Sequence, residues 1–311
     1  MRRAWLAVAV VALALGAAVA VAADPVDEYI AREMAARRIP GVALAVVRDG
    51  VVVKLQGYGF ANLEHDVPVT PDTVFELASL TKQFTASAIM TLVEDGRVKL
   101  DDSVTVSLAN CPETWKPITV RHLLTHTSGL PDLRNGFKSL DQVPERVHYS
   151  TADFFESATK DTLDFAPGER FQYSDVGYFL LGMIVEKASG ARWGDYLAAR
   201  FFKPLGMTST SVLDHQRILK HRAAGYTIRN GELVNIRRIW DVELPSAYGV
   251  FSTVKDLVTW DGALNAGRVL TPASLRLMWT PFSATMVGRA STDSGGSSTT
   301  GAAIRGSATR A

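Results

Sequence analysis

The sequence predicts an α/β protein of the α+β kind, in which an N-terminal antiparallel hairpin is followed by a mostly helical middle. Three observations carry this prediction: a strand–turn–strand pattern over residues 42–55, a series of helix-period segments between residues 79 and 202, and a balanced composition. The 311 residues are 47% hydrophobic, with 33 Lys and Arg against 32 Asp and Glu, which is typical of a folded globular chain.

The N-terminal segment is predicted to lie outside the folded domain. Arg2 and Arg3 precede an uncharged run rich in Ala, Val and Leu over residues 4–23, and small residues at 20–22 match a cleavage pattern. We therefore expect residues 1–22 to be a signal peptide and the protein to be secreted or periplasmic. An uncleaved membrane anchor is the alternative, because twenty apolar residues are just long enough to span a bilayer.

The remaining elements follow from periodicity and from turn residues. Residues 27–38 have helical spacing, and Asp49 and Gly50 separate two β-rich runs, 42–47 and 51–55, as in a hairpin. An apolar-periodic helix is expected from about Ser79 to Asp95, where Gly96 closes it. Further helices are expected at 120–126, 150–159, 176–189 and 193–202.

A nucleophile and a base are expected at the start of the long helix. Ser79 and Lys82 are three residues apart, which on a helix places their Cβ atoms about 5–6 Å apart on one face. A serine in the first turn is also close to free backbone N–H groups and to the positive end of the helix dipole, which favour developing negative charge. Taken alone, the pair also fits an N-cap serine followed by a solvated lysine.

The residues around this pair resemble the serine β-lactamase and penicillin-binding-protein family, especially its class C β-lactamase, DD-peptidase and esterase branch. The similarity begins with the segment around Ser79 and continues through other segments in the family's order. These segments are residues 57–61, 70–86, 118–131, 165–169, 173–178, 204–207 and 251–253. The resemblance covers residues 39–281. It implies the β-lactamase/transpeptidase-like fold, in which an antiparallel sheet is flanked by helices and joined to a mostly helical subdomain.

The resemblance also implies roles for three residues. Ser79 is expected to attack the carbonyl of an amide, lactam or ester and to form an acyl-enzyme. Lys82 acts as a base only if its charged form is destabilised, since an ordinary lysine is protonated at neutral pH. Tyr173 is the second candidate for proton transfer, and the sequence leaves open which of the two is the base.

Asp175 departs from the family pattern, which usually has Asn at this substrate-binding position. An amide can donate to a substrate carbonyl and also accept from the lysine, whereas an ionised carboxylate only accepts. If it lies near Lys82, Asp175 is expected to stabilise the ammonium and to weaken the lysine as a base.

Other functional classes receive little support from the sequence. The net charge of +1 and the absence of a long basic run argue against nucleic-acid binding. His122 and His126 have an i, i+4 spacing, but no third metal ligand accompanies them, and the resemblance places them in a structural helix and turn. Cys111 is the sole cysteine and excludes an internal disulfide. We expect no cofactor and no metal.

The C-terminal segment does not resemble the family. The family carries a further Lys- or His-containing motif on a strand that lines the site, and residues 282–311 are instead a low-complexity sequence. We hypothesise that 282–311 is a frameshifted reading of the family's C-terminal part; a truncation or a flexible linker is the competing explanation. The expected domain is therefore residues 23–281, lacking three C-terminal strands of the family's sheet, and we expect such a chain to fold poorly.

The sequence as a whole predicts an exported serine acyl hydrolase acting on a small molecule or peptide: a β-lactam, a D-amino-acid peptide or an ester. The alternative is a non-catalytic relative that binds cell-wall peptide or a protein partner. Contact with a membrane is expected only if residues 1–22 remain uncleaved.

Overall fold

A computed structural model of the protein describes residues 24–131, 150–214, 217–236 and 245–281. The chain divides into two compact units, residues 1–39 and residues 40–311. The described part of the first unit is helix α1 (Pro25–Arg37), which begins where the Asp24 carboxylate accepts the N–H of Val26 and ends at Arg38 in the left-handed conformation. The segments predicted as a signal peptide (1–22) and as a foreign tail (282–311) lie outside the described residues.

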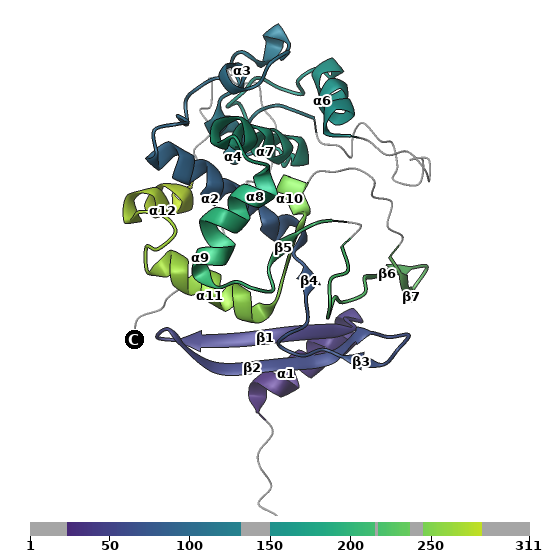
Figure 1. Ribbon diagram of the computed structural model, residues 1–311. Coiled ribbons are helices and arrows are strands. Elements are labelled where there is room, and N and C mark those ends of the chain that lie inside the picture. Colours follow the sequence, from purple (N-terminus) through teal and green to yellow (C-terminus); the bar gives the residue numbers. More distant parts are fainter. Residues whose placement is uncertain (1–23, 132–149, 215–216, 237–244, 282–311) are drawn as a thin grey trace, which may run out of the picture. The chain divides into compact units, whose positions relative to one another are not determined.

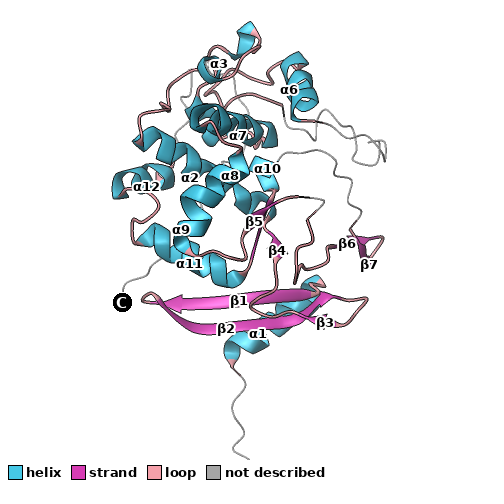
Figure 2. Ribbon diagram, in the orientation of Figure 1, coloured by secondary structure: helices cyan, strands magenta, loops and turns pink. Residues whose placement is uncertain are grey.

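The N-terminal sheet of the second unit has the strand order β1-β2-β3 (Figure 2). Strands β1 (Gly41–Arg48) and β2 (Val51–Asn62) form the antiparallel hairpin that the sequence predicts. Asp49 and Gly50 have φ angles of 50° and 77°, as a two-residue hairpin turn requires. The third strand is β3 (Val67–Pro68), which comes from a segment that reads as a turn in the sequence.

A second small sheet carries the segment that leads to Ser79. Its order is β4-β8-β5, with β4 (Phe75–Glu76) antiparallel to β8 (Val250–Ser252), and β8 antiparallel to β5 (Ser211–Val212). The Leu77 N–H donates to the carbonyl of Val250, which extends this pairing to within two residues of Ser79. A separate hairpin, β6 (Tyr226–Arg229) and β7 (Glu232–Asn235), turns at an Asn-Gly pair.

The helices confirm most of the sequence pattern. Those near the predicted positions are α2 (Thr81–Glu94), α4 (Val120–Leu124), α6 (Thr151–Lys160), α7 (Asp175–Ser189) and α8 (Trp193–Leu197). The helix expected over 193–202 is interrupted, because α8 passes into a π-helical turn, η4 (Ala198–Phe202), and then into α9 (Lys203–Leu205). The remaining elements are η1 (Ala78–Leu80), α3 (Val104–Ser107), η2 (Glu113–Trp115), α10 (Pro245–Tyr248), α11 (Val254–Asn265) and α12 (Pro272–Trp279).

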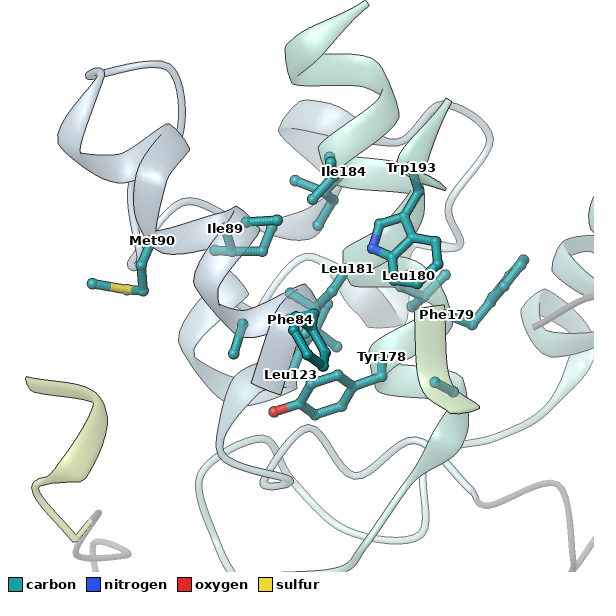
Figure 3. Close-up of a cluster of buried hydrophobic side chains, with 14 of the residues drawn as sticks. Phe84, Ile89, Met90, Leu123, Tyr178, Phe179, Leu180, Leu181, Ile184 and Trp193 are labelled. Atoms are coloured by element: carbon teal, nitrogen blue, oxygen red, sulfur yellow. The ribbon is translucent and has the colours of Figure 1, made fainter. Parts of the chain in front are cut away.

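The hydrophobic core is built around α2 and α7, which pack against each other (Figure 1). Figure 3 shows side chains of both helices within one buried cluster, together with Leu123 of α4 and Trp193 of α8. Phe84 is fully buried and meets the rings of Phe202 and Trp260, at centroid distances of 5.6 and 4.5 Å. These ring contacts hold α2 against η4 and α11, and the packing of α2 on α7 brings the helix that bears Lys82 to the helix that begins at Asp175.

The predicted loss of C-terminal strands and the possibility of a membrane-spanning helix both depend on which residues the structure describes. The three C-terminal strands expected to be missing correspond to a region beyond residue 281, outside the described residues, so this expectation stays a prediction. Within the part of the chain that the structure describes, no helix has the length and apolar character needed to cross a membrane.

Candidate active site

Ser79 lies in η1, the single turn that joins β4 to α2, rather than in α2 itself as the sequence predicts. The preceding residue, Ala78, has a φ of 47°, which is unusual for a non-glycine residue and marks a sharp change of chain direction. Ser79 is exposed, whereas Thr81 and Lys82 immediately after it are buried. The serine hydroxyl is therefore presented at the surface from a firmly held turn.

Lys82 is buried but paired. Its Nζ donates to Oδ1 of Asp175 at 2.6 Å and to the carbonyl oxygen of Ala247 in α10 at 2.9 Å. The lysine and aspartate side chains are only 9% and 16% exposed, so little water screens the ion pair. Burial alone disfavours an ammonium, but here the carboxylate and the carbonyl both favour it.

Tyr173 connects the two other predicted catalytic residues. Its hydroxyl donates to Oγ of Ser79 at 2.8 Å, and its ring centroid lies 4.8 Å from the Nζ of Lys82. The three predicted catalytic residues, which come from η1, α2 and the loop before α7, thus form one cluster. The ring of Tyr178 is also close, with its centroid 5.4 Å from the same Nζ, so two aromatic faces border the ammonium.

Asp175, at the predicted substrate-binding position, contacts the lysine. As the first residue of α7 it lies at the positive end of that helix, where a carboxylate is favoured. The sequence led us to expect this ion pair if Asp175 lies near Lys82, and the two side chains are 2.6 Å apart. An ionised carboxylate here offers no N–H to a substrate.

His126 belongs to this cluster, which the sequence did not predict, since the resemblance places it only in a structural helix and turn. It follows α4, and its ring stacks on that of Tyr173 with centroids 4.5 Å apart and an interplanar angle of 24°. Burial and, next, the Lys82 ammonium lower the pKa of His126 from 6.5 to about 4, against the opposing effect of Asp175. A signal for its placement was present, since residues 118–131 belong to the segments that resemble the family.

Tyr178 closes the inner side of the cluster. It is 6% exposed, and its hydroxyl donates to the carbonyl of Leu124 at 3.2 Å. Burial and, next, the neighbouring Tyr173 raise the pKa of this phenol well above its usual range. Tyr178 therefore stays a neutral phenol, and it contributes an apolar face to the site.

Metal binding has no structural support among the described residues. No group of three or more His, Cys, Asp or Glu side chains there is placed to hold an ion. His122 is engaged elsewhere, since its Nδ1 accepts the Thr119 N–H at 3.2 Å in the capping box of α4. The pair His122 and His126 therefore belongs to the local structure of α4 and the turn after it.

The fold and this serine–tyrosine–lysine cluster define the class of serine acyl hydrolases of the β-lactamase and penicillin-binding-protein type. The chain belongs to the Beta-lactamase family, whose family model matches residues 26–302. The match extends past residue 281, where the sequence resemblance we described ends.

Individual relatives agree with this assignment. Protein flp of Staphylococcus aureus (strain MRSA252) is 32% identical over 242 residues, which cover 76% of this chain and 47% of that protein. Penicillin-binding protein 4* of Bacillus subtilis (strain 168) is 37% identical over 191 residues, covering 60% of this chain and 41% of that protein. The chain thus spans about half the length of the curated relatives it matches.

Solved structures show the same fold. An octameric penicillin-binding protein homologue from Pyrococcus abyssi matches with a TM-score of 0.72 and 31% identity, over 82% of this chain and 59% of that one. A D-amino acid amidase from Ochrobactrum anthropi SV3 matches with a TM-score of 0.67 and 30% identity, over 78% of this chain and 70% of that one. The β-lactamase/transpeptidase-like α/β fold predicted from the sequence is confirmed.

Proposed function

We propose that this protein is an exported serine acyl hydrolase in which Ser79 forms an acyl-enzyme with a β-lactam, a D-amino-acid peptide or an ester. The observation that carries the proposal is the 2.8 Å hydrogen bond between Tyr173 and the exposed Ser79 hydroxyl, beside the buried Lys82 ammonium. A nucleophile in contact with a proton-transfer group and next to a fixed positive charge has the parts that acyl transfer needs.

Tyr173 is the better placed of the two candidate proton carriers. The Nζ of Lys82 donates to the Asp175 carboxylate and to the Ala247 carbonyl, whereas the Tyr173 hydroxyl is in direct contact with the nucleophile. In the proposed step the two hydroxyls exchange donor and acceptor roles relative to the hydrogen bond in the structure. Oγ of Ser79 bonds to the substrate carbonyl carbon and passes its proton to the Tyr173 oxygen. Tyr173 gives its own proton to the leaving nitrogen or oxygen as that bond breaks, and Lys82 contributes positive charge throughout.

Hydrolysis of the acyl-enzyme reverses this proton path. A water molecule attacks the acyl carbon and releases its proton to the Tyr173 oxygen, and Tyr173 returns a proton to Oγ of Ser79 as the acid departs. Tyr173 therefore serves both halves of the reaction.

The nature of the relatives directs the choice of substrate. A penicillin-binding protein and a D-amino acid amidase among them support strained lactams and D-amino acid amides as the carbonyl compounds to test first. The side chain of Asp175 has no N–H to donate to a carbonyl group of a substrate side chain. This favours simple activated esters, which depend least on such a hydrogen bond. Export through residues 1–22 belongs to the same proposal and is tested by N-terminal sequencing of the secreted protein.

The same ion pair favours one alternative function. A lysine whose Nζ donates to Asp175 and to the Ala247 carbonyl offers the serine no free base, as expected of a non-catalytic relative that binds peptide or protein. Covalent chemistry at Ser79 separates the two functions, because a binding protein does not form an acyl-enzyme.

The test is covalent labelling of the full chain with a fluorophosphonate, followed by turnover of nitrocefin, a D-amino acid p-nitroanilide and a p-nitrophenyl ester. We expect stoichiometric labelling that Ser79→Ala abolishes and that the matched control Ser107→Ala, in α3, leaves intact. Wild-type protein that unfolds cooperatively yet takes up no label would exclude the enzyme and favour the binding protein.

A further inference from the structure

His126 reaches the loop that carries Tyr173 from a distant part of the chain. Its ring stacks on the Tyr173 ring, lies 5.1 Å from that of Tyr178, and meets Phe171 edge-on at 5.7 Å. One face of the Tyr173 ring is thus covered by an imidazole that itself rests on a buried aromatic ring. A side chain held in this way has few alternative rotamers.

Hydrogen bonds donated to His126 hold both residues next to Tyr173. The Nδ1 atom of His126 accepts the N–H of Ser174 at 3.1 Å, and its backbone carbonyl accepts the N–H of Gln172 at 2.8 Å. His126 itself has a φ of 57°, and this left-handed conformation directs its carbonyl and its ring to the same loop. Backbone and side chain together fix the segment on either side of Tyr173.

We propose that His126 is the positioning residue of the proton-transfer group, holding the Tyr173 hydroxyl on Oγ of Ser79. The inference rests on the proposed function for its catalytic consequence, and on the stacking and the two flanking hydrogen bonds for its structural part. It assigns a role to a histidine that the sequence places in a structural turn only.

The role requires a neutral imidazole. For Nδ1 to accept the Ser174 N–H, the ring proton must be on Nε2, and a doubly protonated ring would lose this bond. The charged and titratable groups that face the ring are Lys82 from α2 and Asp175, Tyr173 and Tyr178 from α7 and its preceding loop. Burial among them keeps His126 neutral at physiological pH.

Two substitutions separate the contacts of His126. His126→Asn keeps an acceptor near the position of Nδ1 and tolerates the left-handed backbone, but removes the aromatic stack. His126→Phe keeps a ring and removes the acceptor. His122→Asn is the matched control, because His122 makes the same kind of Nδ1 bond at the other end of α4 and does not belong to the Tyr173 cluster.

The decisive measurement is the second-order rate constant for fluorophosphonate labelling of Ser79 in the full chain. We expect both His126 variants to label roughly 10- to 100-fold more slowly than wild type, since a displaced catalytic group loses about this much. His122→Asn is expected to stay within about two-fold of wild type. Labelling of the His126 variants at the rate of His122→Asn would overturn the inference.

A second measurement is independent of activity and so separates this inference from the proposed function. In protein labelled with ¹³C-tyrosine, we expect the Tyr173 ring resonances to shift and to report faster ring motion in His126→Asn, but not in His122→Asn. If the fluorophosphonate does not react with wild type but His126→Asn still shows these spectral changes, the proposed function alone is refuted. Tyr173 resonances unaltered by His126→Asn would refute the positioning role, whatever the labelling rate.

Discussion

Protonation of His126 should change the free energy of unfolding by an amount that follows from its burial in the structure. Burial of the ring lowers its pKa in the folded protein from 6.5 to about 4. Between these two values the unfolded chain binds a proton that the folded chain does not, so the free energy of unfolding decreases as the pH falls. At 1.36 kcal/mol per pKa unit, the full effect is about 3 kcal/mol and is complete once the pH is below about 4.

The variant His126→Asn removes this titration while keeping the acceptor for Ser174. We expect the free energy of unfolding of wild type, relative to His126→Asn, to decrease by about 3 kcal/mol between pH 7.5 and pH 4. The assay is urea unfolding followed by tryptophan fluorescence at several pH values, for which the chain has six tryptophans.

His65→Asn is the control for this experiment, because His65 is exposed in the loop between β2 and β3. Its unfolding free energy should change with pH in parallel with that of wild type. A difference between wild type and His126→Asn that stays constant from pH 7.5 to pH 4 would refute the argument that the imidazole is buried and neutral.

Three further predictions follow from the same contacts. Tyr173→Phe removes the hydroxyl but keeps the ring, so fluorophosphonate labelling of Ser79 should slow by roughly 10²- to 10⁴-fold at little cost in stability. A labelling rate within ten-fold of wild type would contradict the proton-transfer role of Tyr173. Asp175→Asn should lower the unfolding free energy at neutral pH by about 3 kcal/mol, because it removes the charge partner of the buried Lys82. The control Asp72→Asn breaks an exposed ion pair and should cost under about 1 kcal/mol. Equal losses of unfolding free energy in urea would be inconsistent with a buried Lys82–Asp175 pair. Phe84→Ala should cost about 3–5 kcal/mol in the same assay, since its ring is fully enclosed, and a cost below about 1 kcal/mol would argue against this core.

Local signals in the sequence account for the elements that were predicted correctly. Helix α7 agrees with the expected 176–189 because Ser174 caps its start and Gly190, in the left-handed conformation, ends it. The hairpin β1–β2 agrees because Asp49 and Gly50 can adopt the positive φ angles of the turn. Each of these signals acts within a few residues along the chain.

Some local signals were present and not used. Asn230 and Gly231 form the turn of the β6–β7 hairpin, with φ angles of 52° and 82°. Thr253 caps α11 by accepting the N–H of Asp256, and Thr271 followed by a proline begins α12. Both helices and the hairpin could have been predicted from the sequence with the rules that found the others.

The environment of the site could not be predicted from local sequence patterns. The Ser79–Lys82 spacing suggested a nucleophile and a base, but the carbonyl that accepts from Lys82 is 165 positions away, at Ala247. The bond between His126 and Ser174 spans 48 positions. Such contacts depend on how α2, α4, α7 and α10 pack together, and one sequence alone does not specify that packing.

The central claim is that Ser79 is the nucleophile, and peptide mapping after labelling tests it most directly. Full-length protein is treated with a fluorophosphonate, digested with trypsin and examined by tandem mass spectrometry. We expect one adduct per chain, located on Ser79 and absent from Ser79→Ala. An adduct on another residue, or equal labelling of Ser79→Ala, would contradict it.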